Sequence, residues 1–298
     1  MKYVKTPIKR IINALGYDIV PRRLDQKSFA ALYPHCWHSS GFVYDIFGHL
    51  LYQNVADSVN YEVLRGTEPT DYVRKNKDEL ALIIDRVKPG QRVLDVGANI
   101  GLYTLLLARL VGPDGSVTAF EPGPLSFSLL KLNTSLNGYK NIKVENKGVT
   151  DSSRTEYYYS DQATESGSTV TTLTPDFGHP REKITVDTVS LDDYYHELHQ
   201  PIDYIKIDIE GGEYQALKGM TTVLTSNPDL WLTIEYAPYL PLWKDTDLRE
   251  FLRFLRSFGF QIFDLHFSDT EPVEDNYILD AYPKSTVGKY SNLLLLRP

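Results

Sequence analysis

The stretch Val93-Leu94-Asp95-Val96-Gly97-Ala98-Asn99-Ile100-Gly101 decides the fold expected for this chain. Residues 93–96 have the character of a buried strand, and residues 102–111 have the periodicity of a helix. Gly97 and Gly101 permit a tight turn between the two, and without a Cβ they let a ligand approach the backbone. The unpaired N–H groups at the start of the helix would favour an anionic or polar ligand.

Strands and helices alternate on both sides of this stretch. The expected strands cover residues 93–96, 116–120, 142–146, 204–209, 230–235, 260–265 and 292–296, and the expected helices cover residues 71–88, 102–111, 124–137, 213–224 and 247–258. Such alternation predicts a parallel sheet with helices on both faces. No helix is expected between the last two strands, which predicts a final antiparallel strand. Residues 151–190 interrupt the alternation and predict one or two additional hairpins.

Composition and charge narrow the class of protein. The 298 residues are 42% hydrophobic and 23% charged, as in a folded globular protein, and the net charge is −8. An acidic chain lacks the general electrostatic footprint of a nucleic-acid binder, so no nucleic-acid partner is expected. There is no run of 18 apolar residues, and the apolar stretch at 11–16 is too short for a signal peptide. We therefore expect a cytoplasmic location, which agrees with the single cysteine, Cys36.

The N-terminal region differs from the rest. Residues 1–30 carry seven basic and two acidic side chains, and residues 1–16 have the pattern of a short basic amphipathic helix. Either the helix packs on the body of the protein, or it contacts anionic lipid at the inner face of a membrane as a peripheral anchor. We expect residues 1–74 to form an N-terminal extension, with this helix and an irregular aromatic segment, and residues 75–298 to form the main domain.

An acid ends the strand that follows the glycine turn. Glu121 lies 20 residues after Gly101, close to where dinucleotide-binding folds place the acid that binds ribose hydroxyls. The pair predicts a ligand that contains adenosine. The glycines follow the pattern G-x-x-x-G rather than G-x-G-x-x-G, which argues against an NAD-dependent dehydrogenase.

A second group of acids follows the strand at 204–209. Asp208 ends this strand, Glu210 lies in the next turn, and Glu213 begins a helix. Carboxylates there can orient an amine, accept a proton or hold a cation. Glu235 and His266 end later strands, and they form a third, weaker set that could project over the same edge of the sheet.

Five blocks of sequence carry a resemblance to a known family. They occur in order at Val93–Thr104, Ala119–Pro124, Asn133–Asn137, Ser190–Asp192 and Tyr204–Gly219, within roughly residues 90–240. The combination resembles the FkbM family of S-adenosylmethionine-dependent methyltransferases. One departure is Gly212, where an alanine is common in the family.

The resemblance implies a class I methyltransferase fold, which is a Rossmann-like, seven-stranded, mostly parallel sheet with helices on both faces and a final antiparallel strand. It implies S-adenosylmethionine as cofactor and S-adenosylhomocysteine as product. In the implied site, Glu121 binds the ribose and Asp208 lies near the sulfonium. The other implied cofactor-binding residues are Asp95, Gly97, Ala98, Asn99, Gly101 and Pro122.

The implied reaction is O-methylation of a sugar or another small hydroxylated acceptor. Such an acceptor must lose a proton, and the candidates for this catalytic role are Asp208, Glu210 and His266, in that order. No metal ligands are predicted, although a divalent cation on Asp208 and a neighbouring carboxylate would be an alternative means of activation. Trp243 and Tyr290 are among the aromatic candidates for pocket walls.

Two other functions are weighed against this one. A non-catalytic module could keep the fold and hold a glycan or a protein on its aromatic surface, and an NAD-dependent dehydrogenase is the third candidate. The acids Asp95, Glu121 and Asp208 argue against the binding module, because it would not require them. The sequence predicts no oligomeric state.

Overall fold

The computed structural model describes residues 41–46, 49–54, 76–160, 167–170, 182–198 and 200–298. The basic helix expected at residues 1–16 lies outside these residues, as do Cys36 and the boundary expected near residue 74. Among the helices of the described segments, none combines the length and apolarity that a membrane span needs.

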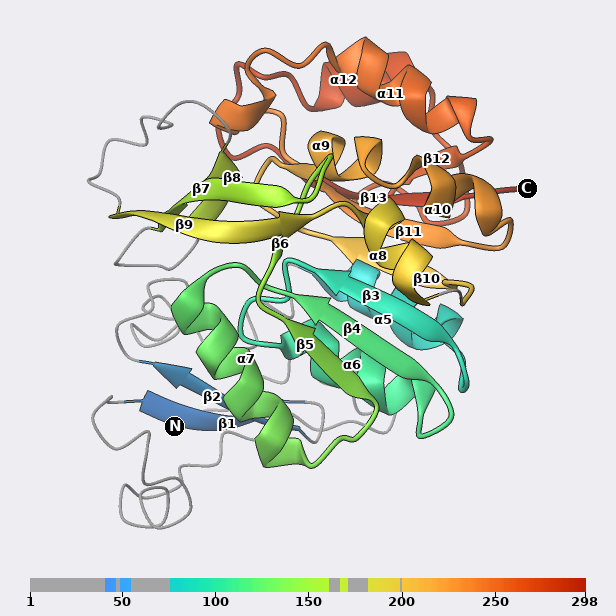
Figure 1. Cartoon of the computed structure of the whole chain (residues 1–298). Coiled ribbons are helices and arrows are strands. Elements are labelled where there is room, and N and C mark those ends of the chain that lie inside the picture. The colour runs from blue at the N-terminus through green and yellow to red at the C-terminus, as the bar shows by residue number, and fades with distance from the viewer. Residues whose placement is uncertain (1–40, 47–48, 55–75, 161–166, 171–181, 199) are drawn as a thin grey trace, which may run out of the picture.

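A seven-stranded sheet forms the centre of the described chain, in the order β12-β13-β11-β10-β3-β4-β5 (Figure 1). Its strands are β3 (Arg92–Val96), β4 (Ser116–Phe120), β5 (Ile142–Glu145), β10 (Tyr204–Ile207), β11 (Trp231–Tyr236), β12 (Gln261–Asp264) and β13 (Ser291–Leu296). The strands from β11 to β5 are parallel, whereas β13 is antiparallel to both of its neighbours. This arrangement confirms the predicted class I methyltransferase fold.

The strand order reverses between β3 and β10. From β3 the chain proceeds to β4 and β5 on one side, and it later returns to β10 and β11 on the other. In an open α/β sheet, the crevice at the carboxyl ends of the strands beside such a reversal is where ligands bind. The topology therefore places the turns after β3 and β10 next to each other.

Helices cover both faces of the sheet (Figure 1). One face packs on α5 (Lys77–Arg86), α6 (Leu102–Val111) and α7 (Pro124–Asn137), and the other packs on α8 (Leu191–Leu198), α9 (Glu213–Lys218), α10 (Thr221–Ser226), α11 (Leu248–Ser257) and α12 (Asp275–Ala281). Each face has its own hydrophobic core, called here the α5–α7 core and the α8–α12 core. Side chains alternate along a strand, so Tyr204 of β10 packs in the α5–α7 core, whereas Ile205 and Ile207 pack in the α8–α12 core.

A smaller sheet and a hairpin flank the main sheet. Strands β6 (Gly148–Val149), β7 (Arg154–Ser160), β8 (Gly167–Val170) and β9 (Glu182–Val189) pair in the order β6-β9-β7-β8, and the antiparallel pairs of β7 confirm the predicted hairpin structure. The hairpin of β1 (Gly41–Ile46) and β2 (His49–Asn54) lies beside α7 (Figure 1). His49 is hydrogen-bonded to the hydroxyl of Tyr139 at 2.6 Å, and Leu51 is buried in the α5–α7 core. This part of the N-terminal extension therefore packs on the main domain.

Two helical expectations were wrong. Helix α12 lies between β12 and β13, where no helix was expected. It contributes only one buried core residue, Ile278, and a 2.6 Å ion pair between Asp275 and Arg256 of α11 joins it to its neighbour, so its apolar pattern is weak. The helix expected at 213–224 is instead the pair α9 and α10. Gly219 ends α9, and a Cβ there would overlap the carbonyl oxygen of Thr150.

Candidate functional site

The turn between β3 and α6 is held by backbone contacts. The N–H groups of Gly97 and Ala98 donate to the carbonyl oxygen of Phe120, at 3.0 and 2.9 Å. Gly97 has a φ of +85°, and a Cβ there would overlap the carbonyl oxygen of Asp208. Gly101, with a φ of +98°, is the N-cap of α6. The turn therefore presses against the ends of both β4 and β10, and only glycine fits at its first position.

Glu121 connects this turn to the one after β4. The residue is 6% exposed, and its carboxylate accepts the N–H of Asn99 on Oε2 at 2.9 Å and that of Gly123 on Oε1 at 2.8 Å. Its two oxygens thus join the turn after β3 to the turn after β4. The structure brings together six residues expected to bind the cofactor: Gly97, Ala98, Asn99, Gly101, Glu121 and Pro122.

Asp95 lies beneath the turn rather than at its open edge. The residue is 1% exposed, and its Oδ2 accepts the hydroxyl of Thr104 at 2.5 Å. Among the described residues, its Oδ1 has no hydrogen-bond partner. Burial raises the pKa of Asp95, and the positive charge of Lys206 opposes that rise. Asp95 therefore joins the end of β3 to α6 through Thr104, beneath the turn.

Lys206 is a buried cation that the sequence analysis did not identify. It is 3% exposed, and its Nζ donates to Oδ2 of Asp208 at 2.8 Å. It also lies 4.3 Å from the ring centroid of Tyr103, whose hydroxyl donates to Glu79 at 2.7 Å. The Lys206 side of this ion pair is buried and the Asp208 side is partly exposed, so the charge-assisted hydrogen bond orients Asp208 from within the sheet. The signal was a lysine in the middle of the apolar strand Tyr204–Ile207.

The turn between β10 and α9 is rich in acids. Asp208 is partly open to solvent, and Glu210 has the left-handed φ of +55°, which is uncommon for a residue with a side chain. Glu213 accepts the N–H groups of Ile209 and Gly211 on Oε1, at 3.1 and 3.0 Å. Burial raises the pKa of Glu213 to about 7. Glu213 thus holds the turn in shape, and Asp208 and Glu210 lie on it.

Glu235 joins this acidic group from β11. Its Oε2 is buried and has no hydrogen-bond partner among the described residues. Burial raises the pKa of Glu235 well above its usual value, and the negative charges of Asp208, Glu210 and Glu213 add to that rise. The sequence placed Glu235 only in a third, weaker set, whereas the structure places it within the acidic group.

Tyr290 and His266 lie beside the acids. Burial raises the pKa of Tyr290, and so do the charges of Glu235 and Asp208. The ring of His266 is 5.8 Å from that of Tyr290, but the His266 side chain is exposed, so this residue lies at the rim. Trp243 is fully buried in the α8–α12 core, so the expectation that it lines a pocket was wrong.

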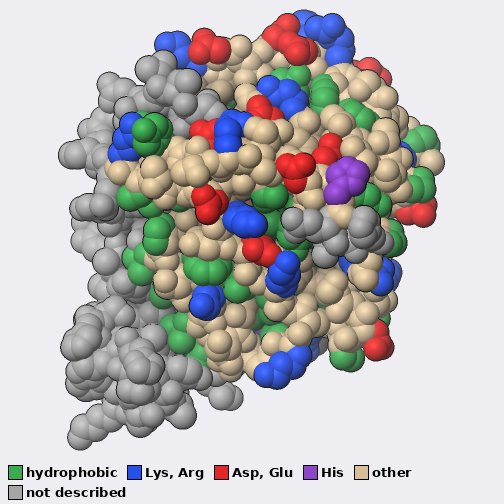
Figure 2. Space-filling view, in the orientation of Figure 1, with side chains coloured by type: hydrophobic (Ala, Val, Ile, Leu, Met, Phe, Trp, Pro, Cys, Tyr) green, Lys and Arg blue, Asp and Glu red, His purple; other side chains and the backbone are tan. Residues whose placement is uncertain are grey.

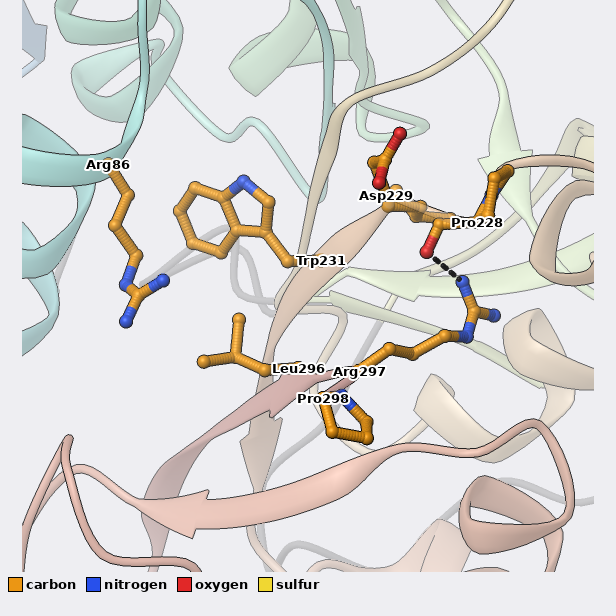
Figure 3. A pocket seen from close by; sticks show the side chains of 8 residues that line it. Arg86, Pro228, Asp229, Trp231, Leu296, Arg297 and Pro298 are labelled. Carbon is orange, nitrogen blue, oxygen red and sulfur yellow. Dashed lines mark hydrogen bonds between the residues drawn. The ribbon is translucent and has the colours of Figure 1, made fainter.

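A separate pocket lies at the opposite end of the strands. Its lining residues are Arg86, Pro228, Asp229, Leu230, Trp231, Leu296, Arg297 and Pro298 (Figure 3). Trp231 begins β11, so this pocket is at the amino end of the strand that ends near Glu235. The guanidinium of Arg297 donates to the carbonyl oxygens of Asn227 and Pro228, which gives it a structural role.

The donor set at the carboxyl edge fits a cationic, adenosine-containing cofactor. The glycine turn and the carboxylate of Glu121 occupy one side, and acids occupy the other. The described residues contain no group of three or more His, Cys, Asp or Glu side chains that could hold a metal ion.

Three relatives share part of the sequence. Methyltransferase 1 of Beauveria bassiana is 28% identical over 144 residues, which are 43% of this chain and 57% of that protein. The 31-O-demethyl-FK506 methyltransferase FkbM of Streptomyces tacrolimicus is 29% identical, over 45% of this chain and 61% of that protein. The hexuronic acid methyltransferase AglP of Haloferax volcanii is 28% identical, over 52% of this chain and 60% of that protein. The chain thus spans about three-fifths of the length of these curated relatives.

A family model matches the region that builds the site. The model described as the methyltransferase FkbM domain matches residues 95–262, which is more than half of the chain. This range begins at Asp95, before the glycine turn, and it includes Glu121, the acidic turn and Glu235. The chain therefore belongs to the FkbM family of methyltransferases.

Proposed function

We propose that this protein is an S-adenosylmethionine-dependent methyltransferase that transfers a methyl group to a hydroxyl of a sugar or another small metabolite. One observation carries the proposal. The glycine turn with Glu121 and the acidic turn with Asp208 lie at the same edge of the sheet, where the strand order reverses. Family membership supports the same activity.

The cofactor-binding role falls to the first turn and to Glu121. The carboxylate of Glu121 at the end of β4 suits the ribose hydroxyls, and we assign the turn at 97–101 to the methionine part. When bound, S-adenosylmethionine supplies an electrophilic methyl group on a cationic sulfur. The carboxylates of Asp208 and Glu210 face that edge with negative charge, which favours a cation there.

The chemical role of the protein is mainly to hold two reactants in line. Positioning of this kind can supply ~7–11 kcal/mol of the barrier reduction. The hydroxyl must also lose its proton to a group within hydrogen-bond reach. Asp208 and Glu210 lie on the acidic turn, and His266 remains a candidate at the rim, beside Tyr290.

The names of two relatives support a hydroxyl acceptor. One is named for a 31-O-demethyl compound and the other for hexuronic acid. A sugar or small metabolite is therefore the acceptor class proposed here. On the face in Figure 2, acidic and basic side chains are interspersed, without a continuous basic area that nucleic acid would favour. A cytoplasmic location, with peripheral membrane contact through residues 1–16, stays a prediction.

Ligand-dependent melting tests the cofactor. A ligand that binds only the native state at 100 times its Kd stabilises it by about 2.7 kcal/mol, so S-adenosylhomocysteine should raise the melting temperature and NADH should not. Absence of a shift in a folded sample would overturn the proposal. Transfer of a labelled methyl group to a cell extract, followed by mass analysis, would separate an enzyme from a binding module.

Glu121→Ala gives a residue-level test of the same site. The variant loses the carboxylate that joins the two turns, so we expect its melting shift with S-adenosylhomocysteine to shrink or vanish. Glu271→Ala is the matched control, because it removes one acid at an exposed position, and it should keep the full melting shift. Equal shifts in both variants would remove Glu121 from the cofactor site.

A further inference from the structure

The register of the sheet makes Glu235 the neighbour of Asp208. Ile207 of β10 pairs with Ile234 of β11 in a parallel ladder, so Asp208 and Glu235 are the next residues along the two strands. Residues that follow a paired position on adjacent parallel strands leave the same face of the sheet. On its other side, Glu235 pairs with Asn292 of β13. Glu235 is thus built into the sheet at the edge where the proposed cofactor binds.

The neighbouring acids differ in what already occupies their oxygens. Oδ2 of Asp208 accepts the buried Nζ of Lys206 at 2.8 Å. Oε1 of Glu213 accepts two backbone N–H groups. Oε2 of Glu213 and Oε2 of Glu235 are both buried without a hydrogen-bond partner among the described residues, but Glu213 is tied to the backbone of its own turn, whereas Glu235 lies beside Asp208 in the sheet. Such a group is costly to bury, and a substrate hydroxyl would satisfy it.

The charges around Glu235 come from the acidic turn and from β10. The acidic turn contributes Asp208, Glu210 and Glu213, and β10 contributes the cation Lys206. The negative charge of Glu235 also contributes to the raised pKa values of Tyr239 and Tyr290. Burial is the largest cause of the raised pKa of Glu235, followed by the acids of the turn. A carboxyl group of this kind takes up a proton readily and suits general-base chemistry.

We propose that Glu235 is the general base that takes the proton of the acceptor hydroxyl, while the ion pair with Lys206 holds Asp208 in place. This inference rests on the proposed methyltransferase function. As the O–CH₃ bond forms and the C–S bond breaks, the acceptor proton passes to the Glu235 carboxylate. The positive charge of the sulfonium and the negative charge of the carboxylate disappear together, so the step leaves no net charge in the site.

Proton release on cofactor binding tests the role of Glu235 without an acceptor. A sulfonium cation close to Glu235 favours its ionised form, whereas neutral S-adenosylhomocysteine does not. Binding of S-adenosylmethionine near pH 7 should therefore release more protons than binding of its product, by up to about one per site. Calorimetric titration in buffers of different ionisation enthalpy measures this difference.

Two isosteric variants separate the buried acids. We expect Glu235→Gln to bind both ligands and to lose the difference in proton release, whereas Glu213→Gln, which removes one of the charges that raise the pKa of Glu235, should reduce the difference without abolishing it. The proposal stands only if the difference depends on Glu235 and survives Glu213→Gln, and any other pattern overturns it. If the wild-type protein binds neither ligand, the proposed function fails instead, so the two failures are distinguishable.

Turnover gives the second readout. With labelled S-adenosylmethionine and the extract fraction that the wild-type protein methylates, we expect Glu235→Gln to lower the rate about 100-fold or more at unchanged cofactor affinity. The wild-type rate should rise with pH through the ionisation of Glu235, and this dependence should be absent from the variant. A rate within about threefold of wild type would overturn the assignment, because general-base catalysis contributes far more.

Discussion

The two turns at the candidate site are built in opposite ways. The turn after β3 is made of backbone: its glycines allow close approach, and its N–H groups are bound to Phe120 and Glu121. The turn after β10 is made of side chains, with an ion pair at Asp208 and a buried carboxylate at Glu213. The first turn fixes a shape, whereas the second concentrates negative charge.

This difference predicts which changes each turn tolerates. A turn defined by backbone shape should fail when a Cβ is added, since no side chain can move aside. A turn defined by carboxylates should respond to pH and to charge, and it should accept small changes of shape where a flexible side chain can yield. Substitutions in each turn therefore test the comparison.

The largest effect is expected for Gly97→Ala. Its φ is +85° and its Cβ would overlap the carbonyl oxygen of Asp208, so we expect the free energy of unfolding to fall by about 3 to 5 kcal/mol. Chemical denaturation measures this loss. Gly90→Ala is the matched control, because Gly90 has a φ of +84° and no atom near its added Cβ. It should lose only about 1–2 kcal/mol, and a similar loss in both variants would refute the role of the close contact.

The next effect is the pH dependence of stability at Glu213. Burial raises its pKa from 4.5 to about 7, so the native state keeps a proton that the unfolded chain releases. The stability that this group contributes is fully present below about pH 4.5, and it is lost as the pH rises through 7. The loss amounts to about 3 kcal/mol.

Glu213→Gln removes this titration. Relative to wild type, the variant should therefore gain stability between pH 5 and pH 8, by up to about 3 kcal/mol. Urea denaturation of both proteins at several pH values measures the gain, and the other acids contribute equally to both curves. A constant difference across this range would show that Glu213 does not titrate there.

The smallest effect is expected for Gly212→Ala. Gly212 has an ordinary φ of −82°, and an added Cβ would lie 3.1 Å from Cδ1 of Ile209, which can move. We expect a change of about 1 kcal/mol or less, with the melting shift by S-adenosylhomocysteine retained. Gly211→Ala should be worse than this, because the φ of Gly211 is +104°. If Gly212→Ala abolished ligand binding, the second turn would be as shape-dependent as the first.

Much of the fold could be predicted because the strands and most helices carry strong local patterns. The strand at 93–96 and the helix at 102–111 appear within one residue of their expected bounds. Helix α12 could not be predicted, because its position depends on contacts with α11 that no local period reveals. Between α9 and α10, Gly219 packs against the backbone of Thr150, which is 69 residues away and which no local pattern reveals.

The sequence by itself determined the seven strands of the main sheet, the family resemblance and the residues of both turns, since these depend on local spacing. Only the tertiary structure decided which acids are neighbours and what pairs with them. Register placed Glu235 beside Asp208, and Lys206, buried in the sheet, is paired with the carboxylate of Asp208. Contacts between strands that are distant in sequence set burial and charge, and these two quantities assign different roles to carboxylates that look alike in the sequence.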